Sequence, residues 1–278
     1  MKKALIIPNP KKDPDLKVTY KVRDKLVSLG IESEIEENFV EKSSPSEESI
    51  GDGFDFLVVV GGDGTVIDAA WYAIDKDIPL LGVNLGRVGY LSEVEPNSLD
   101  QLDFIAEGKF SVSERMLLSI DSEFCINRHR YAVNDIVISH ESYLGIADIR
   151  LEDSVGNSIK YRSDGLILST PQGSTAYSLS AGGPVVAHDV DSIIATPVCA
   201  HSFFNRSVVF NSREHIRITN ISSDPLNISV DGRYTGSLPP GKSCSIAQAE
   251  KRLKMINLSK NSMFSNLFKK MKMLEDNE

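Results

Sequence analysis

The segment Phe54–Val60 constrains the fold most, because it is a continuous apolar run of strand length that glycines follow at once. Such a run is typical of a strand buried on both faces of a parallel sheet. The stretch Val66–Ile74 then has a helical pattern, and Ile78–Val83 is a second buried strand. Strand, glycine turn, helix and strand in this order predict part of an open, doubly wound parallel α/β sheet.

The rest of the first 112 residues continues this alternation. Asp13 and Pro14 predict a helix start, with Asp as the N-cap and Pro at the first helical position. Gly30 and Gly108 are placed to end helices. The acidic, serine-rich stretch 36–52 is interpreted as a mobile surface loop. The further expected strands and helices are Lys3–Ile7, Asp13–Leu29, Ile31–Ile35 and Ser98–Glu107.

After residue 112 the pattern changes to alternating, strand-like segments punctuated by turn signals such as Asp231-Gly232. We therefore expect an antiparallel all-β domain at 113–252. Helical spacing of apolar residues in the tail predicts an amphipathic C-terminal helix that packs back on the first domain, here 1–112 plus 253–278, or on another subunit. The expected strands are Met116–Ile120, Tyr131–Ser139, Ala147–Leu151, Ser158–Arg162, Gly165–Ser169, His215–Thr219 and Leu226–Val230, and the tail residues are Phe264, Leu267, Phe268 and Met271.

Composition excludes several classes of function. The 30 Lys and Arg residues stand against 39 Asp and Glu residues, a net charge of -9, which disfavours a nucleic-acid-binding protein. The apolar runs are too short for a transmembrane helix, and Pro8 ends the first of them, so no membrane segment or signal peptide is expected. Three widely spaced cysteines favour a cytoplasmic protein with reduced thiols, and neither they nor the five histidines have metal-ligand spacing.

The turn Gly61-Gly62-Asp63-Gly64-Thr65 lies directly between the buried strand and the helix. Glycines let backbone N–H groups approach a phosphate, and the N-terminus of the following helix favours negative charge. Asp63 would repel a bare phosphate, so it is better suited as a base for a hydroxyl or as a partner of a phosphate-bound metal. The alternative is a purely structural turn with Asp63 as a helix cap. Neither a Walker A loop nor a Gly-x-Gly-x-x-Gly fingerprint is present.

Two further segments are candidates for ligand binding. The run Arg162–Pro184 is dense in small and hydroxylated residues, which suits a polar, flat ligand, although a serine- and glycine-rich loop without a ligand fits equally well. Asn134-Asp135 interrupts an apolar strand. Because a buried carboxylate without a partner is costly, this pair either lines a cavity or ends the strand.

Taken together, the glycine turn, the segment Asn84–Leu91, the Asn134-Asp135 pair and the run Arg162–Pro184 resemble the NAD kinase family. The resemblance covers most of the chain and implies an α/β domain followed by a β domain. It further implies transfer of a terminal phosphoryl group, from ATP with a divalent cation such as Mg²⁺ or from polyphosphate, to the 2′-hydroxyl of the adenosine ribose of NAD. Family members are generally cytoplasmic homodimers or homotetramers.

The same resemblance implies roles for individual residues. Asp63 matches the proposed general base, Asn134 and Asp135 the pair that grips the dinucleotide near the adenosine, and Tyr177 a ring available for stacking. The implied site residues are Gly61, Gly62, Asp63, Gly64, Thr65, Asn134, Asp135, Arg162, Asp164, Thr175, Ala176, Tyr177, Ser178, Leu179 and Ser180.

Two positions depart from the family pattern. Asp68 stands where many members carry a basic residue, so that phosphate contact is not carried over. Arg233 stands where many have Gln, and it either meets a phosphate or lies on a hairpin turn. Two other functions stay open: a related kinase acting on a lipid or sugar hydroxyl, against which the polar run Thr175–Ser180 speaks, and a non-catalytic NAD(P)-binding sensor, against which the intact Asp63 speaks.

Overall fold

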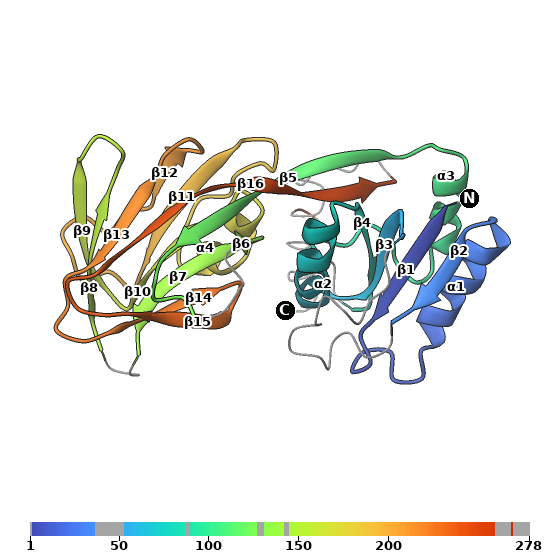
Figure 1. Cartoon of the computed structure of the whole chain (residues 1–278), viewed down its shortest axis with the longest axis horizontal. Helices are drawn as coiled ribbons and strands as arrows, with labels where there is room; N and C mark the ends of the chain where they lie inside the picture. Colours follow the sequence, from blue (N-terminus) through green and yellow to red (C-terminus); the bar gives the residue numbers. More distant parts are fainter. Residues whose placement is uncertain are drawn as a thin grey trace. The chain divides into compact units, whose positions relative to one another are not determined.

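The computed structural model describes residues 2–36, 53–86, 89–126, 131–141, 145–258 and Phe268 (Figure 1). The chain divides into two compact units, Met1–Glu114 with Leu253–Glu278, and Arg115–Arg252. The loop expected at 36–52 lies outside the described residues except for Glu36, and so does the expected C-terminal helix apart from Phe268.

The first unit is built on a parallel sheet. Its strands are β1 (Lys3–Pro8), β2 (Glu32–Ile35), β3 (Phe56–Gly61) and β4 (Leu80–Asn84), in the order β2-β1-β3-β4. The last part of β16 (Ser243–Asn257) joins beside β4, where Met255 pairs with Leu80 in parallel. Every residue of β3 and β4 is buried, as the continuous apolar runs predict. The expected parallel α/β sheet is confirmed.

Helices cover this sheet. Alternate strand residues such as Ile6 and Val58 form one core with Val22 and Leu26 of α1 (Lys17–Ser28) and with buried residues of the short helices η1 (Leu99–Leu102) and α3 (Asp103–Ala106). Helix α2 (Asp63–Lys76) packs against β3 and β4 and lies apart from α1 in Figure 1. The first unit therefore positions the glycine turn at the carboxyl end of a fully buried strand.

Helix α1 begins at Lys17, so the start predicted at Asp13-Pro14 is wrong. The backbone N–H groups of Lys12 and Asp13 both donate to the Asn9 carbonyl at 3.0 and 2.9 Å, which folds residues 10–15 into turns before the helix. Asp13 still serves the helix, because its buried carboxylate accepts the N–H of Thr19 at 2.9 Å. The helix therefore begins about one turn later than the Asp13-Pro14 signal predicts.

The second unit consists of antiparallel sheets, as expected. Strand β10 (Gly165–Ser169) follows β9 (Ser158–Ser163) directly in sequence but belongs to the six-stranded sheet. It pairs there with β7 (Asp135–His140) and β11 (Ser192–Val198). The six-stranded sheet has the order β12 (Val208–Asn211), β11 (Ser192–Val198), β10 (Gly165–Ser169), β7 (Asp135–His140), β14 (Leu226–Val230) and β15 (Arg233–Leu238). The other strands are β5 (Ser111–Asp121), β6 (Tyr131–Ala132), β8 (Ala147–Glu152), β9 (Ser158–Ser163), β13 (Ile216–Asn220) and the first part of β16.

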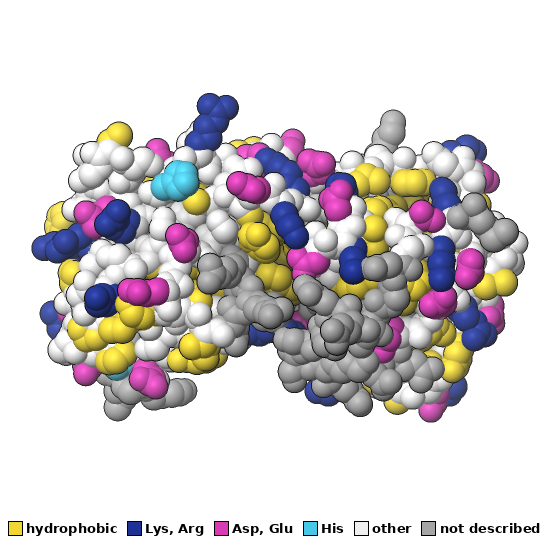
Figure 2. Space-filling model, in the orientation of Figure 1, with side chains coloured by type: hydrophobic (Ala, Val, Ile, Leu, Met, Phe, Trp, Pro, Cys, Tyr) yellow, Lys and Arg dark blue, Asp and Glu magenta, His cyan; other side chains and the backbone are white. Residues whose placement is uncertain are grey.

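Charged side chains of both signs lie on the surface of the protein (Figure 2). On the face in Figure 2, Lys and Arg side chains are interspersed with Asp and Glu side chains instead of gathering into one basic area. Within the part of the chain that the structure describes, no helix is both long and apolar enough to cross a membrane.

Candidate functional site

The glycine turn has the geometry of a strand-to-helix junction. Gly61 is the last residue of β3, Gly62 precedes the helix in extended conformation, and α2 begins at Asp63. A Cβ atom at Gly61 would lie 2.6 Å from the Thr65 side chain, so no larger residue fits there without a shift. Because the first N–H groups of a helix have no partner within it, this junction favours an anion such as a phosphate.

Asp63 has a structural role that the sequence did not reveal. Its two carboxylate oxygens accept the backbone N–H groups of Tyr90 and Leu91 at 3.0 and 3.2 Å. A Cβ atom at Gly89 would collide with the same carboxylate. The N-cap position of α2 is Gly62, and the Asp63 carboxylate is bonded to Tyr90 and Leu91, so the alternative of Asp63 as the helix cap is wrong. The carboxylate instead holds the segment that follows β4 against the glycine turn.

Lys12 is a candidate residue that the sequence interpretation missed. A Cβ atom added at Gly62 would meet the Lys12 ammonium, and one added at Gly86 would lie 3.8 Å from it. The turn that carries Lys12 is also fastened to α2, because the Asn9 side-chain amide donates to the Thr65 hydroxyl at 2.7 Å. The position of Lys12 in the sequence could have indicated that it lies near the glycine turn. Lys12 follows β1, and the carboxyl ends of neighbouring parallel strands meet at one edge of the sheet.

In the second unit, the Asn134-Asp135 pair lies where β6 gives way to β7. The Asn134 carbonyl accepts the N–H of Thr170 at 2.9 Å, and a Cβ atom at Gly173 would lie 2.7 Å from the Asn134 Cα atom. Asp135 is buried and stands opposite Ser169 in the β7–β10 register. The structure therefore brings the pair into contact with the start of the serine-rich run.

Asp135 has an unusual electrostatic environment. Burial and the nearby carboxylate of Asp231 raise the pKa of Asp135 to about 7. The buried Oγ of Ser169 and Oε1 of Gln172 have no hydrogen-bond partner among the described residues. Unsatisfied buried polar atoms are uncommon in folded proteins, and each needs an explanation such as a catalytic role or a bound water or ion. The pair thus lies at the start of β7, beside unsatisfied buried polar atoms of the serine-rich run.

The run Thr175–Ser180 divides into buried and exposed side chains. It spans the end of η2 (Gly173–Thr175) and α4 (Tyr177–Ser180). Thr175 and Ser178 are buried, and the Ser178 hydroxyl is hydrogen-bonded to that of Thr196 at 3.0 Å. Tyr177 is 47% exposed, whereas Ser178 is fully buried and stabilises the turn through its hydrogen bond. Tyr177, Leu179 and Ser180 are thus the side chains of this run that remain accessible.

Arg162 and Asp164 lie apart from the Asn134-Asp135 pair. Both side chains are exposed, and Asp164 immediately precedes β10, whereas Asp135 pairs with Ser169 at the other end of that strand. Five residue steps of about 3.3 Å separate Asp164 from Ser169 by about 16 Å along the strand. The structure therefore does not bring these two groups together.

Comparison with known proteins now decides the family. The model of the ATP-NAD kinase N-terminal domain matches residues 6–110, and that of the ATP-NAD kinase C-terminal domain matches residues 133–258. The chain belongs to the NAD kinase family. The resemblance inferred from the motifs is thereby confirmed.

Relatives of the NAD kinase family match along almost the whole chain. The NAD kinase of Acetivibrio thermocellus is 36% identical over 277 residues, covering 96% of each chain, and that of Caldanaerobacter subterraneus is 34% identical over 279 residues, covering 97% of this chain and 98% of the relative. A crystal structure of an NAD kinase from Archaeoglobus fulgidus in complex with ATP is 26% identical, with a TM-score of 0.77 over 97% of this chain and 98% of that one. Yeast NADH kinase complexed with NADH, 22% identical, has the same fold, with a TM-score of 0.81 over 98% of this chain and 88% of that one.

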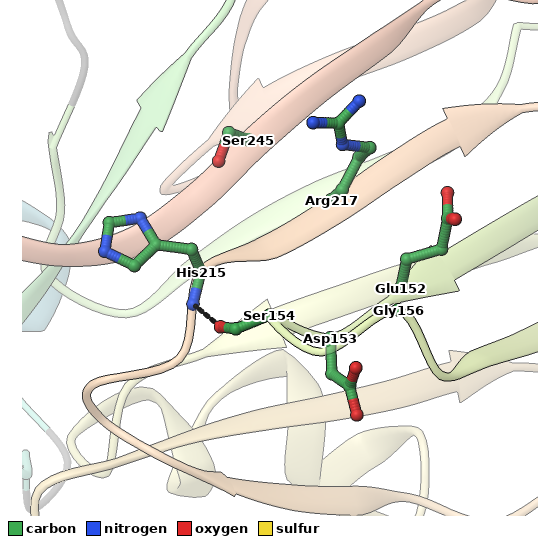
Figure 3. Close-up of a pocket in the computed structure, with 7 residues that line it drawn as sticks. All are labelled: Glu152, Asp153, Ser154, Gly156, His215, Arg217 and Ser245. Carbon is green, nitrogen blue, oxygen red and sulfur yellow. Dashed lines mark hydrogen bonds between the residues drawn. The ribbon is translucent and has the colours of Figure 1, made fainter.

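One surface pocket of this NAD kinase family member contains none of the implied site residues. Figure 3 shows it in the second unit, lined from the β8–β9 turn, β13 and β16. The N–H of His215 donates to the Ser154 hydroxyl at 3.1 Å across it. Its lining carries charges of both signs, and the exposed side chains of His215 and Arg217 lie in open solvent. It is therefore distinct from the candidate active-site residues.

Proposed function

We propose that this protein is an NAD kinase that transfers the terminal phosphoryl group of ATP, or of polyphosphate, to the 2′-hydroxyl of the adenosine ribose of NAD, making NADP. The observation that carries the proposal is the glycine turn, with Asp63 at the N-terminus of a long helix, in a chain that belongs to the NAD kinase family. The relatives named NAD kinase and the family structure that holds ATP support both substrates.

Asp63 is proposed as the general base that accepts the proton of the 2′-hydroxyl. Each carboxylate oxygen already accepts one backbone N–H, which fixes the orientation of the group. A carboxylate has about four acceptor positions, so both oxygens keep room for a hydroxyl donor. A fixed acceptor of this kind suits phosphoryl transfer, in which positioning and charge neutralisation contribute most of the catalysis.

The donor phosphates are proposed to lie at Gly61, Gly62, Gly64 and Thr65, beside the ammonium of Lys12. In the described residues, no group of three or more His, Cys, Asp and Glu side chains could hold a metal ion. Mg²⁺ is commonly bound through substrate phosphates and one or two carboxylates, and Asp63 is a carboxylate within the glycine turn. We therefore propose that Asp63 and the phosphates of ATP would hold Mg²⁺, which would supply neutralisation of phosphate charge there.

Lys12→Ala is expected to raise the KM for ATP by about tenfold or more, because a charge-assisted hydrogen bond to a phosphate is lost. The KM for NAD should change little. Lys11→Ala is the matched control, since it removes a neighbouring exposed lysine of the same turn. Initial rates at varied ATP concentration measure the effect, and equal KM values in the two variants would contradict a role for Lys12.

The dinucleotide is proposed to bind in the second unit. Asn134 and Asp135 would hold the adenosine end, the accessible Tyr177 would stack on a ring, and Thr175–Ser180 would wrap the nucleotide. Arg162 and Asp164 would then meet a different part of the extended ligand, since Asp164 lies about 16 Å along the strand from Ser169, the partner of Asp135. We also propose that the protein is a homodimer or homotetramer, which the family resemblance supports, and that it is cytoplasmic, which three widely spaced cysteines support.

A coupled assay of NADP formation tests the proposed function. Purified protein, NAD and Mg²⁺ are incubated with ATP or with polyphosphate, and NADP is detected by an NADP-specific dehydrogenase. We expect NADP with at least one donor. Tight NAD binding without turnover would instead identify a sensor, and phosphorylation of a lipid or sugar alone would identify a different kinase.

A further inference from the structure

Asp231 binds the backbone that carries the Asn134-Asp135 pair. One of its carboxylate oxygens accepts the N–H groups of Asn134 and Asp135 at 2.7 and 3.1 Å, and the other accepts that of Val133 at 2.8 Å. The backbone N–H of Asp231 in turn donates to the Asp135 carbonyl at 2.9 Å. Four hydrogen bonds thus join one residue to a three-residue segment almost a hundred positions earlier in the chain.

The position of Asp231 is set by a tight hairpin. Asp231 and Gly232 form the two-residue turn between β14 and β15, with φ angles of 48° and 75°. Positive φ at both positions is the geometry of a type I′ turn, which Asp-Gly favours and which suits the twist of the flanking strands. Strand β14 also pairs directly with β7. The same sheet therefore fixes both Asp231, which follows β14, and the backbone segment at the start of β7 that Asp231 binds.

The two carboxyl groups also share one electrostatic environment. The strands β10 and β14 that flank β7 contain no titratable side chain, and among the described residues the charged groups that act on Asp135 are Asp231 and, through Asp231, Arg233. Burial raises the pKa of Asp231, while its three N–H bonds and the Arg233 charge oppose that rise. Those N–H groups stabilise the anion of Asp231 more than its protonated form, so the first proton that this pair of carboxyl groups takes up binds to Asp135.

We propose that Asp231 is a positioning residue for NAD: its carboxylate fixes the backbone of Asn134 and Asp135 and so orients this pair toward the dinucleotide. This inference rests on the proposed function, which places the pair at the adenosine end of NAD. An ionised Asp135 only accepts hydrogen bonds, and its protonation removes an acceptor that a ribose hydroxyl or an amino group would use. NAD affinity should therefore fall as the pH falls through the pKa of Asp135, which is about 7.

Asp231→Asn is the informative variant, because asparagine tolerates the left-handed backbone conformation. It keeps one acceptor oxygen, turns an amide N–H toward a backbone donor and removes the negative charge. We expect the KM for NAD to rise about tenfold or more, with a smaller change in kcat. The acid limb of the profile of kcat/KM against pH should move down by about one pH unit, because Asp135 loses a negative neighbour. Asp224→Asn, an exposed carboxylate before β14, should leave both quantities unchanged.

A merely structural Asp231 would lower the melting temperature of the variant without moving the acid limb, and that result would overturn the proposal. NAD binding to the same variants, measured by calorimetry at pH 6 and 8, separates this outcome from a failure of the kinase reaction itself. Should Asp231→Asn not fold, hydrogen exchange in the wild-type protein decides. If the amides of Val133, Asn134 and Asp135 are protected as strongly as those of β7, the result supports the three hydrogen bonds to Asp231. Rapid exchange of these amides contradicts them.

Discussion

Asp63→Asn is expected to lower kcat by about 10²–10⁴-fold while NAD still binds, because the 2′-hydroxyl loses the group that accepts its proton. The asparagine side chain is nearly isosteric, but only its oxygen accepts a hydrogen bond. It therefore keeps one of the contacts to Tyr90 and Leu91 and loses the other. Part of any loss of activity could thus come from movement of the segment after β4.

Two measurements separate these causes. NAD affinity and the melting temperature report the structural effect, and single-turnover rates at saturating NAD and ATP report the chemical one. Asp75→Asn is the matched control, since it removes an exposed carboxylate from the last part of the same helix. Full turnover in Asp63→Asn would remove Asp63 from the role of base, whatever its stability.

Gly173→Ala is expected to weaken NAD binding by about tenfold or more and to lower the free energy of unfolding by about 1–3 kcal/mol. The added Cβ atom would collide with the Asn134 carbonyl and lie 2.7 Å from the Asn134 Cα atom. Both obstacles are backbone, so the strain can be relieved only by moving the Asn134-Asp135 segment or the turn of the serine-rich run. Either movement displaces residues proposed to hold the adenosine end.

Calorimetric NAD titration and urea unfolding measure the two effects in Gly173→Ala. Gly156→Asn is a suitable control, because nothing lies within 4 Å of a Cβ atom there and asparagine tolerates its φ of 91° better than other residues. Unchanged NAD affinity in Gly173→Ala would mean that the contact between the two segments has no bearing on the ligand.

The first unit could be predicted well because its signals are local. Continuous apolar runs identified the buried strands, and Gly30 and Gly108 adopt the positive φ angles expected at the ends of helices. The start of α1 was misplaced because a capping carboxylate can reach the first turn from outside the helix, as Asp13 does. Patterns of single residues do not distinguish those two arrangements.

The second unit was harder to predict strand by strand. Strand β11 contains Pro197, a residue type that argues against a central strand. The 15-residue β16 mixes apolar, polar and charged positions. Neither was predicted, and β12 and β15 were also missed. The expected strand Tyr131–Ser139 is divided into β6 and β7 by the backbone segment that Asp231 binds.

The candidate site was predictable only where its residues form a motif. The glycine turn and the Asn134-Asp135 pair are contiguous in sequence and carry a recognisable chemistry. Lys12 and Asp231 act through distant partners: Asp231 accepts N–H groups from residues 96 to 98 positions away. Such contacts arise from strand pairing, and no local pattern encodes them.

The measurement that tests the central claim most directly is ³¹P NMR of the protein incubated with NAD, ATP and Mg²⁺. Transfer to the 2′-hydroxyl predicts a new phosphomonoester signal coupled to the 2′ proton of the adenosine ribose, growing as the γ-phosphate signal of ATP declines. The same mixture with 2′-deoxy-NAD should give no such signal. A phosphomonoester on another hydroxyl, or release of inorganic phosphate without any new ester, would contradict the proposed reaction.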